Sequence, residues 1–157
     1  MEFIKIIDSE NLVEKLIKYD DSATRKISKR VGNLTQYAEK LIQYAENYVV
    51  QDKKKEVGFL SFYANERTRT YAYLTLIAVD IRVRGQGIGK LMMQYMEEEC
   101  KKIEFENIRL EVDKENKNAV GFYKSLGFKV KSNASEISYY MEKRLRKDEM
   151  EEKRNCF

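Results

Sequence analysis

The chain has 157 residues, 43% of them hydrophobic and 11% aromatic, and this size and composition suit a single domain with one core. Its net charge of +4 comes from 30 basic and 26 acidic residues spread along the chain, so no basic stripe indicates a nucleic-acid-binding protein. No apolar run reaches the roughly 18 residues of a membrane span, and MEFIKIIDSE lacks the order of a signal peptide, so we expect a soluble cytoplasmic protein without a membrane partner.

The N-terminal part of the chain predicts one strand followed by two helices. EFIKIID alternates apolar and charged residues as a strand does, and Asp8 or Ser9 can then cap a helix whose apolar residues lie in NLVEKLI. A polar segment, DDSATRKISKRV, follows. After Gly32, apolar residues at steps of three and four predict a second amphipathic helix that runs to about Asn47.

From Tyr48 onward the spacing of apolar residues changes to two, which predicts strands. YVVQ, EVGFLSFYA and TYAYLTLIAVD are separated by the polar turns DKKK and NERTR. Short polar turns between such strands indicate an antiparallel meander. The third strand is apolar on both faces near Leu74 to Val79, as expected for a central strand that is covered on each side.

The remaining elements alternate between helices and strands. VRGQGIGKLMMQYM starts a helix that runs to about Lys102, NIRLEVD is a short strand, and NKNAVGFYKSLGF is a helix that Gly127 ends. KVKSN and EISYYMEKRL form a closing strand pair. The predicted order is β-α-α-β-β-β-α-β-α-β-β, an α+β (mixed α/β) fold with six to seven strands and about four helices. We expect residues 1–146 to form one domain and residues 147–157 to form a charged C-terminal extension.

The glycine-rich stretch VRGQGIGK lies between a strand and a helix, an arrangement that binds phosphate. The first N–H groups of a helix have no partners within it, and the helix dipole adds positive potential there. A Walker A loop would need Gly five residues before Gly89 and Ser or Thr after Lys90, but Arg84 and Leu91 occupy those positions. A dinucleotide fingerprint would need Gly or Ala where Lys90 stands, and the elements before it do not form a βαβ unit.

Two motifs together resemble the GNAT superfamily of acetyl-coenzyme A-dependent N-acetyltransferases. RGQGIG, which starts at Arg84, is similar to the family's pyrophosphate-binding motif of Arg or Gln, two residues, Gly, one residue, and Gly or Ala. Residues 116–128, NKNAVGFYKSLGF, are similar to its N-x-x-A-x-x-x-Y-x-x-x-G-F segment. The resemblance is specific from about Tyr71 to Phe128, and it departs from many members at Ile81, where they carry Pro. It implies a GNAT-like, mostly antiparallel central sheet that splays between its fourth and fifth strands.

The resemblance assigns acetyl-coenzyme A (acetyl-CoA) to the glycine turn. Backbone amides from Gln86 to Lys90 would cradle the pyrophosphate, supported by the Arg84 amide and the Lys90 side chain. The strand edge near Ile77 would bind the pantetheine arm and offer an N–H group to an oxyanion, and Asn116 would contact the arm. The full coenzyme-binding set that we expect is Leu76, Ile77, Val79, Arg84, Gly85, Gln86, Gly87, Ile88, Gly89, Lys90, Asn116, Ala119, Phe122 and Tyr123.

Tyr123 occupies the position at which the family usually places the tyrosine that protonates the leaving thiolate. Transfer of an acetyl group from a thioester to an amine requires a neutral amine and a stabilised oxyanion, and it ideally includes a proton for the leaving thiolate. Periodicity alone favours another interpretation, in which Tyr123 packs on an apolar helix face with Ala119 and Leu126. The resemblance favours the catalytic role.

Glu111 is the candidate general base. It lies on the polar face of its strand beside Arg109 and Asp113, and its spacing from Asn116 and Tyr123 resembles the protein N-terminal alanine acetyltransferase branch. In that branch a glutamate at this position serves as the base through a water molecule. The alternative is a solvated or salt-bridged carboxylate, with water and backbone groups deprotonating the amine.

The residue types that are missing from the chain limit its chemistry further. No histidine occurs, so proton transfer must use Glu, Asp, Tyr, Lys, Cys or water. The two cysteines, Cys100 in a predicted helix and Cys156 near the end, form neither a disulfide framework nor a metal-ligand pattern. We therefore expect no metal and no covalent enzyme intermediate, and a direct attack of the amine within a ternary complex.

The acceptor amine is not specified by any motif. Tyr71, Tyr73 and Thr75 alternate on one face of the central strand and could line the acceptor side or simply pack, while Tyr139 and Tyr140 point to opposite faces. Specificity is expected to depend on the first two helices, the SKRVGN connection and the final hairpin. A small-molecule amine and a peptide N-terminus both fit, for a monomer or a homodimer. The alternative function is a non-catalytic acyl-CoA-binding regulatory module.

Overall fold

The computed structural model describes residues 1–22 and 26–145, so the extension predicted for residues 147–157 lies outside the described part of the chain. Within that part the elements follow the predicted order, with one short helix added. They are β1 (Glu2–Lys5), α1 (Ser9–Lys18), α2 (Ile27–Arg30), α3 (Leu34–Tyr44), β2 (Ala45–Asp52), β3 (Lys55–Tyr63), β4 (Tyr71–Val79), the 3-10 turn η1 (Ile81–Val83), α4 (Ile88–Lys102), β5 (Asn107–Asp113), α5 (Lys117–Ser125), β6 (Lys129–Asn133) and β7 (Ser138–Arg144).

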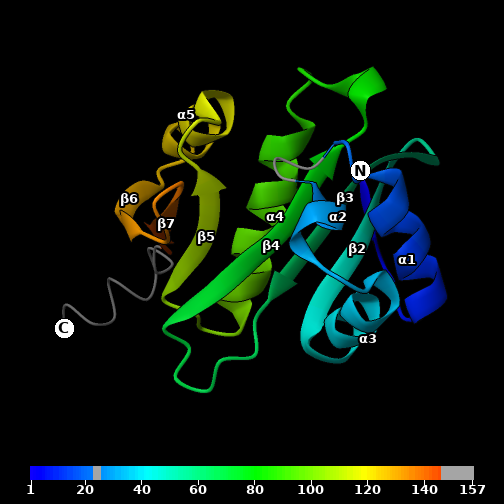
Figure 1. The fold of residues 1–157 in the computed structure, drawn as a ribbon, viewed down its shortest axis with the longest axis horizontal. Helices are drawn as coiled ribbons and strands as arrows, with labels where there is room; N and C mark the ends of the chain where they lie inside the picture. The colour runs from blue at the N-terminus through cyan, green and yellow to red at the C-terminus, as the bar shows by residue number, and fades with distance from the viewer. Residues whose placement is uncertain (23–25, 146–157) are drawn as a thin grey trace.

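The seven strands form one mixed sheet in the order β1-β2-β3-β4-β5-β7-β6. Every neighbouring pair is antiparallel except β4 and β5, which are parallel. Their pairing runs from Tyr71 opposite Asn107 to Leu74 opposite Leu110, after which the two strands diverge. Figure 1 shows this divergence, with the glycine turn and α5 at the open end. The predicted splay between the fourth and fifth strands is thereby confirmed.

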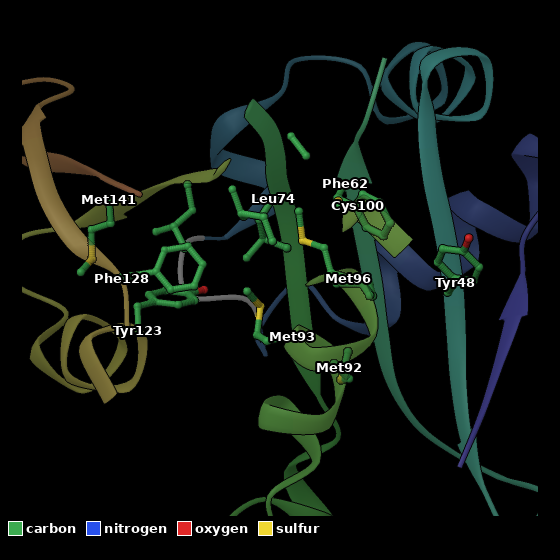
Figure 2. Packing of buried hydrophobic residues seen from close by; sticks show 14 of the residues in the cluster. Tyr48, Phe62, Leu74, Met92, Met93, Met96, Cys100, Tyr123, Phe128 and Met141 are labelled. Carbon is green, nitrogen blue, oxygen red and sulfur yellow. The ribbon is translucent and has the colours of Figure 1, made fainter. Parts of the chain in front are cut away.

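Helices cover both faces of the sheet, and each face has its own apolar core. On one face, α4 and α5 pack a cluster around Met92, Met96 and Phe62, shown in Figure 2. On the other face, α1, α2 and α3 bury Leu12, Leu41 and other apolar side chains against β2, β3 and β4. This two-layered burial is what makes β4 apolar along its length, as expected for a central strand.

A β-bulge at Thr75 changes which face of β4 its side chains occupy. Phe62 of β3 lies opposite Leu74 and Ser61 lies opposite Leu76, so Thr75 is an extra residue without a partner in the register. Leu74 therefore packs in the α4 cluster, whereas Leu76, two residues later, packs in the α1 and α3 cluster. A bulge also increases the local twist of its strand, and this one lies where β4 and β5 part.

Two predicted helix boundaries agree with the structure, one fixed by a side chain and one by a glycine backbone. Asp8 caps α1 by accepting a hydrogen bond from the Asn11 N–H at 2.8 Å, and Gly127 ends α5 with a φ of +96°. The second predicted helix ends earlier, at Tyr44 instead of about Asn47. The Asn47 side chain is buried in β2 and accepts a hydrogen bond from the Ser61 hydroxyl of β3 at 2.6 Å, which holds it in the sheet.

Two further observations concern the whole described part of the chain. Within residues 1–22 and 26–145, no helix is both long and apolar enough to cross a membrane. The same residues contain no cluster of three or more Cys, Asp or Glu side chains that could hold a metal ion.

Candidate active site

The approach to the glycine turn is fixed by Asp80, directly after β4. The Asp80 N–H donates to the Val57 carbonyl at 2.8 Å, which extends the pairing with β3 by one residue. Its carboxylate accepts hydrogen bonds from the Arg82 backbone N–H at 2.9 Å and from the Arg82 guanidinium at 2.8 and 3.0 Å. These contacts make Asp80 the N-cap of η1 and fix the path of the chain from β4 into the glycine turn.

The glycine turn presents the free N-terminus of a 15-residue helix. Gly85 and Gly87 have φ values of +80° and +81°, in the left-handed region that favours glycine, and no atom lies within 4 Å of where a Cβ of either residue would stand. Gly87 is the N-cap of α4, so no side chain satisfies the first N–H groups of the helix. Those N–H groups and the helix dipole can hold an anion.

A cavity of about 620 Å³ opens next to this helix N-terminus. Its volume is in the range of sites for small molecules and cofactors. Its lining combines the cationic residues Arg84 and Lys90 and the first residues of α4 with apolar residues such as Phe122, so the cavity fits a ligand that has both a phosphorylated and an apolar part. The lining residues are Asp21, Ser22, Ile77, Ala78, Val79, Arg84, Gly85, Gly87, Ile88, Gly89, Lys90, Asn116, Asn118, Ala119, Phe122 and Tyr123.

The Arg84 side chain folds back over the turn. Its Nε donates to the Val79 carbonyl at 3.3 Å and its Nη2 donates to the Ser22 carbonyl at 3.2 Å. Arg84 thereby joins the glycine turn to the end of β4 and to the segment after α1. This contact explains why Asp21 and Ser22, far away in the sequence, line the cavity.

The open edge of β4 contributes backbone groups to the same cavity. Because peptide groups alternate in direction along a strand, and Asp80 N–H points toward β3, the N–H and C=O groups of Ile77 and Val79 point toward the gap next to β5. The Val79 carbonyl, which accepts from Arg84, and the Thr75 carbonyl, which accepts from Arg30 at 3.4 Å, lie on that edge too. A backbone N–H at Ile77 therefore faces the gap, and its role as an oxyanion donor stays a prediction.

A second, smaller recess of about 40 Å³ lies in the gap between β4 and β5. It shares Ile77 and Tyr123 with the larger cavity, so the two spaces meet at these residues. Its size suits the end of a slender group. The other lining residues are Arg30, Tyr73, Leu74, Thr75, Leu76, Leu110, Glu111, Val112 and Asp113.

Tyr123 packs against neighbouring aromatic rings and also lines both cavities. Its ring lies 5.3 Å from that of Phe122 and 5.7 Å from that of Phe128, and only 4% of the residue is exposed. Figure 2 shows its hydroxyl directed away from α5 toward β4. Burial raises the pKa of Tyr123, so the phenol keeps its proton at neutral pH. The packing and catalytic interpretations are therefore compatible.

Glu111 is an exposed residue of β5 that lines the recess, and it lies opposite Tyr140 of β7 in the sheet. Burial raises the pKa of Tyr73 to about 12, and the negative charge of Glu111 adds to this effect while Arg30 opposes it. Glu111, Tyr73 and Arg30 therefore lie close together. Tyr71 lies at the start of β4, and its ring is 4.1 Å from the Arg109 guanidinium. Arg109 in turn forms an ion pair with Glu142 at 3.0 Å.

Most of the expected coenzyme-binding residues line the large cavity, with two differences. Leu76 lines the small recess instead, and Gln86, although exposed in the turn, lines neither. Asn116 lines the cavity and also caps α5, accepting a hydrogen bond from the Ala119 N–H at 3.1 Å. Sequence reasoning missed Asn118, which follows Asn116 within the same motif.

The final hairpin and the described cysteine contribute little to the site. Tyr139 packs against the core and Tyr140 lies 5.1 Å from Arg109, so the two rings do point to opposite faces and neither lines the recess. Cys100 is fully buried in α4, and burial raises the pKa of its thiol to about 12. A thiol in this state is not a nucleophile for acetyl transfer.

The chain is similar in sequence to known N-acetyltransferases. It is 33% identical over 81 residues to the peptidyl-lysine N-acetyltransferase YjaB of Salmonella typhimurium, which covers 52% of this chain and 48% of that protein. It is 36% identical over 88 residues to an uncharacterized N-acetyltransferase of Methanocaldococcus jannaschii, covering 54% of this chain and 39% of that one. The chain thus matches half or less of the length of these relatives.

Solved structures with the same fold match nearly the whole chain. The ribosomal-protein-S18-alanine N-acetyltransferase of Escherichia coli superposes with a TM-score of 0.71 at 17% identity, covering 94% of this chain and 95% of that one. The PaiA N-acetyltransferase of Thermoplasma acidophilum, in complex with coenzyme A, gives a TM-score of 0.68 at 19% identity, with coverages of 92% and 99%. The acetyltransferase (GNAT) family model matches residues 13–128, and the chain therefore belongs to the GNAT acetyltransferase family.

Proposed function

We propose that this protein is an N-acetyltransferase that moves an acetyl group from acetyl-CoA to a primary amine by direct attack in a ternary complex. The observation that carries the proposal is the meeting of two cavities at Ile77 and Tyr123. The larger one fits a phosphorylated ligand and the smaller one fits the end of a slender second molecule. A pure coenzyme-binding module would not need the second space.

Coenzyme binding depends mainly on backbone groups. The first N–H groups of α4 would hold the pyrophosphate, with the cationic side chain of Lys90 beside it. Ile77 and Val79 would pair with the pantetheine arm through the open edge of β4. Acetyl-CoA, when bound, supplies an activated acetyl group as a thioester. The structure of the PaiA N-acetyltransferase in complex with coenzyme A supports this assignment by analogy.

Ile77 would stabilise negative charge as the amine attacks. Its N–H faces the junction of the two cavities and is held in place by the pairing of β4 with β3. A fixed backbone donor needs no reorganisation during the reaction, and loss of one such donor costs other enzymes on the order of 100-fold to 1,000-fold in rate.

Tyr123 would donate the proton that the departing thiolate needs. Its hydroxyl reaches the junction, its ring is locked by Phe122 and Phe128, and its raised pKa keeps it protonated. Glu111, on the opposite wall of the recess, would accept a proton from the amine, directly or through water. The two groups thus face the same small space from α5 and β5.

The acceptor is a primary amine of a small molecule, a lysine side chain or a peptide N-terminus. The name of one relative specifies peptidyl-lysine and that of one structural neighbour specifies an alanine of a ribosomal protein, and both are amine acceptors. The recess has space for an amine at the end of a narrow chain in each case.

The test is release of the coenzyme A thiol from acetyl-CoA in the presence of a panel of primary amines, with wild type and Tyr123→Phe. The variant keeps the packed ring, so we expect an unchanged affinity for acetyl-CoA by calorimetry and a kcat lower by roughly 100-fold or more. Tyr139→Phe removes a hydroxyl outside both cavities and should have wild-type kcat. Equal activity of Tyr123→Phe and wild type would remove Tyr123 from the mechanism, and acetyl-CoA binding without transfer to any amine would favour a regulatory module.

A further inference from the structure

Helix α2 is short but firmly attached to the domain. Ile27 is 1% exposed and packs in the core beneath α1 and α3. The Ser28 backbone N–H and hydroxyl both donate to the Asp20 carboxylate at 2.8 Å. These contacts fix the position from which the next residues of the helix, Lys29 and Arg30, project.

Arg30 reaches the small recess from this helix. Its Nη1 donates to the Thr75 carbonyl at 3.4 Å, on the open edge of β4, and it lines the recess together with Glu111 and Tyr123. A guanidinium has five N–H donors, so this single long hydrogen bond leaves most of them available. Arg30 is itself exposed and can turn toward a bound molecule.

The charge of Arg30 is not neutralised by the described part of the protein. Arg69, Arg82 and Arg109 each have a carboxylate oxygen within 4.0 Å. Within residues 1–22 and 26–145, no carboxylate lies that close to Arg30, although Asp113 and Glu111 line the other wall of the same recess. Arg30 on α2 therefore brings a positive charge to one side of the recess, and the carboxylates of Glu111 and Asp113 lie on β5 at the other side.

A site with opposite charges on its two walls fits a molecule that carries both charges. Arg30 contacts Thr75, and the reacting amine would lie at Ile77, two residues farther along β4. Two extended residues span about 7 Å. A guanidinium binds a carboxylate in a planar, paired geometry that a lysine cannot offer.

We propose that Arg30 binds a carboxylate of the acceptor, so that the preferred acceptor is an amine whose carboxylate lies about 7 Å from the amine nitrogen. This inference rests on the proposed acetyltransferase function and specifies its substrate class. An ω-amino acid with several methylene groups has this shape, and so does a lysine in a peptide with an acidic neighbour. Amino acids with a single carbon between the two groups are too short to reach both walls.

Binding and proton transfer would be divided between the two walls of the recess. Arg30 would bring the acceptor to the recess by binding its carboxylate, and Glu111 would accept the proton of the amine, as in the proposed mechanism. An amine without a carboxylate would gain nothing from Arg30.

The experiment compares kcat/KM for ω-amino acids with kcat/KM for alkylamines of the same chain length. The series runs from glycine through β-alanine, γ-aminobutyrate and δ-aminovalerate to ε-aminohexanoate, and a second arm uses lysine peptides with Glu or Gln beside the lysine. Wild type, Arg30→Gln and Lys29→Gln are assayed. Lys29→Gln removes one positive charge from the same helix outside the recess.

We expect wild type to prefer the carboxylated acceptor by roughly 10-fold to 100-fold at the longer chain lengths or in the Glu peptide, and the responding arm identifies the source of the carboxylate. Arg30→Gln should bring this ratio close to one, and Lys29→Gln should retain it. A wild-type ratio near one in both arms, or a preference that survives in Arg30→Gln, would overturn the proposal. Failure to acetylate any amine despite binding acetyl-CoA would instead count against the acetyltransferase function itself.

Discussion

The two cavities that meet at Tyr123 are built in different ways. The large cavity is formed mostly by one continuous stretch, the end of β4 with the glycine turn and the start of α4, and its polar groups are largely backbone N–H groups. The small recess takes charged side chains from α2 and β5, which are about eighty residues apart in sequence. A site made of backbone groups is encoded in a local motif, whereas a site made of distant side chains exists only in the folded protein.

The two cavities should also differ in which substitutions they tolerate. The N–H groups of α4 remain whatever side chains follow, provided that the glycines allow the turn. In the recess, each charge belongs to one side chain and disappears with a single substitution. We therefore expect substitutions in the turn to abolish coenzyme binding and substitutions in the recess to change only the second substrate or its rate.

The largest effect is expected for Gly87→Glu. Its φ of +81° costs a side-chain-bearing residue about 1–2 kcal/mol, and a carboxylate at the N-cap of α4 would occupy the N–H groups and repel a phosphate. Isothermal titration should show micromolar binding of acetyl-CoA to wild type and no measurable binding to the variant. If the variant bound acetyl-CoA like wild type, the pyrophosphate would not lie in this turn.

Two matched variants separate charge from backbone strain in that measurement. Gly87→Ala adds a Cβ without a charge, so it should lower the melting temperature slightly and weaken acetyl-CoA binding far less than Gly87→Glu. Gly32→Glu adds the same charge at an exposed position with open space around it, and it should bind acetyl-CoA normally.

An intermediate effect is expected for Glu111→Gln. Removal of the proposed base should lower kcat/KM by roughly 10-fold to 100-fold, while acetyl-CoA affinity stays the same. Asp113→Asn is the control, because Asp113 lines the same recess on the same strand. Similar losses in both variants, or none, would leave Glu111 as a carboxylate without a role in proton transfer.

The smallest effect is expected for Asp80→Asn, which tests the support of the turn. Hydrogen bonds from the Arg82 guanidinium and backbone N–H hold the pKa of Asp80 well below its usual range. A carboxylate with a lowered pKa stabilises the fold above its unfolded pKa of about 3.9 and loses this contribution as the pH falls through its folded value. The melting temperature of the variant should therefore lie a few degrees below that of wild type at neutral pH.

The pH dependence checks this interpretation of Asp80. The difference in melting temperature between wild type and Asp80→Asn should shrink as the pH falls below about 4. Arg82→Gln, which removes the other partner, should show the same trend. A difference that is constant with pH would mean that Asp80 acts through its shape and not through its charge.

Much of the fold follows from local patterns in the sequence. The range predicted for β5 and the end predicted for α4 coincide with the structure, because alternation in NIRLEVD and helical spacing after the glycine turn are unambiguous. Helix α2 has only four residues, too few to show a period, so it was predicted as a polar connection. The bulge at Thr75 was hidden because apolar residues flank it on both sides.

Some residues of the candidate site could likewise be predicted from local motifs, and others could not. Two motifs can be recognised in the sequence by their spacing. They contain Gly87, Asn116 and Tyr123, which all line the large cavity. Arg30 carries no local signal, since an arginine in a charged segment is usually solvated. Only the contact of its guanidinium with the Thr75 carbonyl, forty-five residues away, assigns it to the recess.

The extra residue at Thr75 makes the site sensitive to the length of β4. Removal of Thr75 would make Leu74 and Leu76 consecutive residues opposite Phe62 and Ser61, so β4 would continue its register with β3 without a bulge. The local twist at the point where β4 and β5 part would then decrease, and we expect the gap between these strands to narrow. We expect this deletion to impair the proposed site through the path of the backbone alone, an effect that no substitution of a side chain would reproduce.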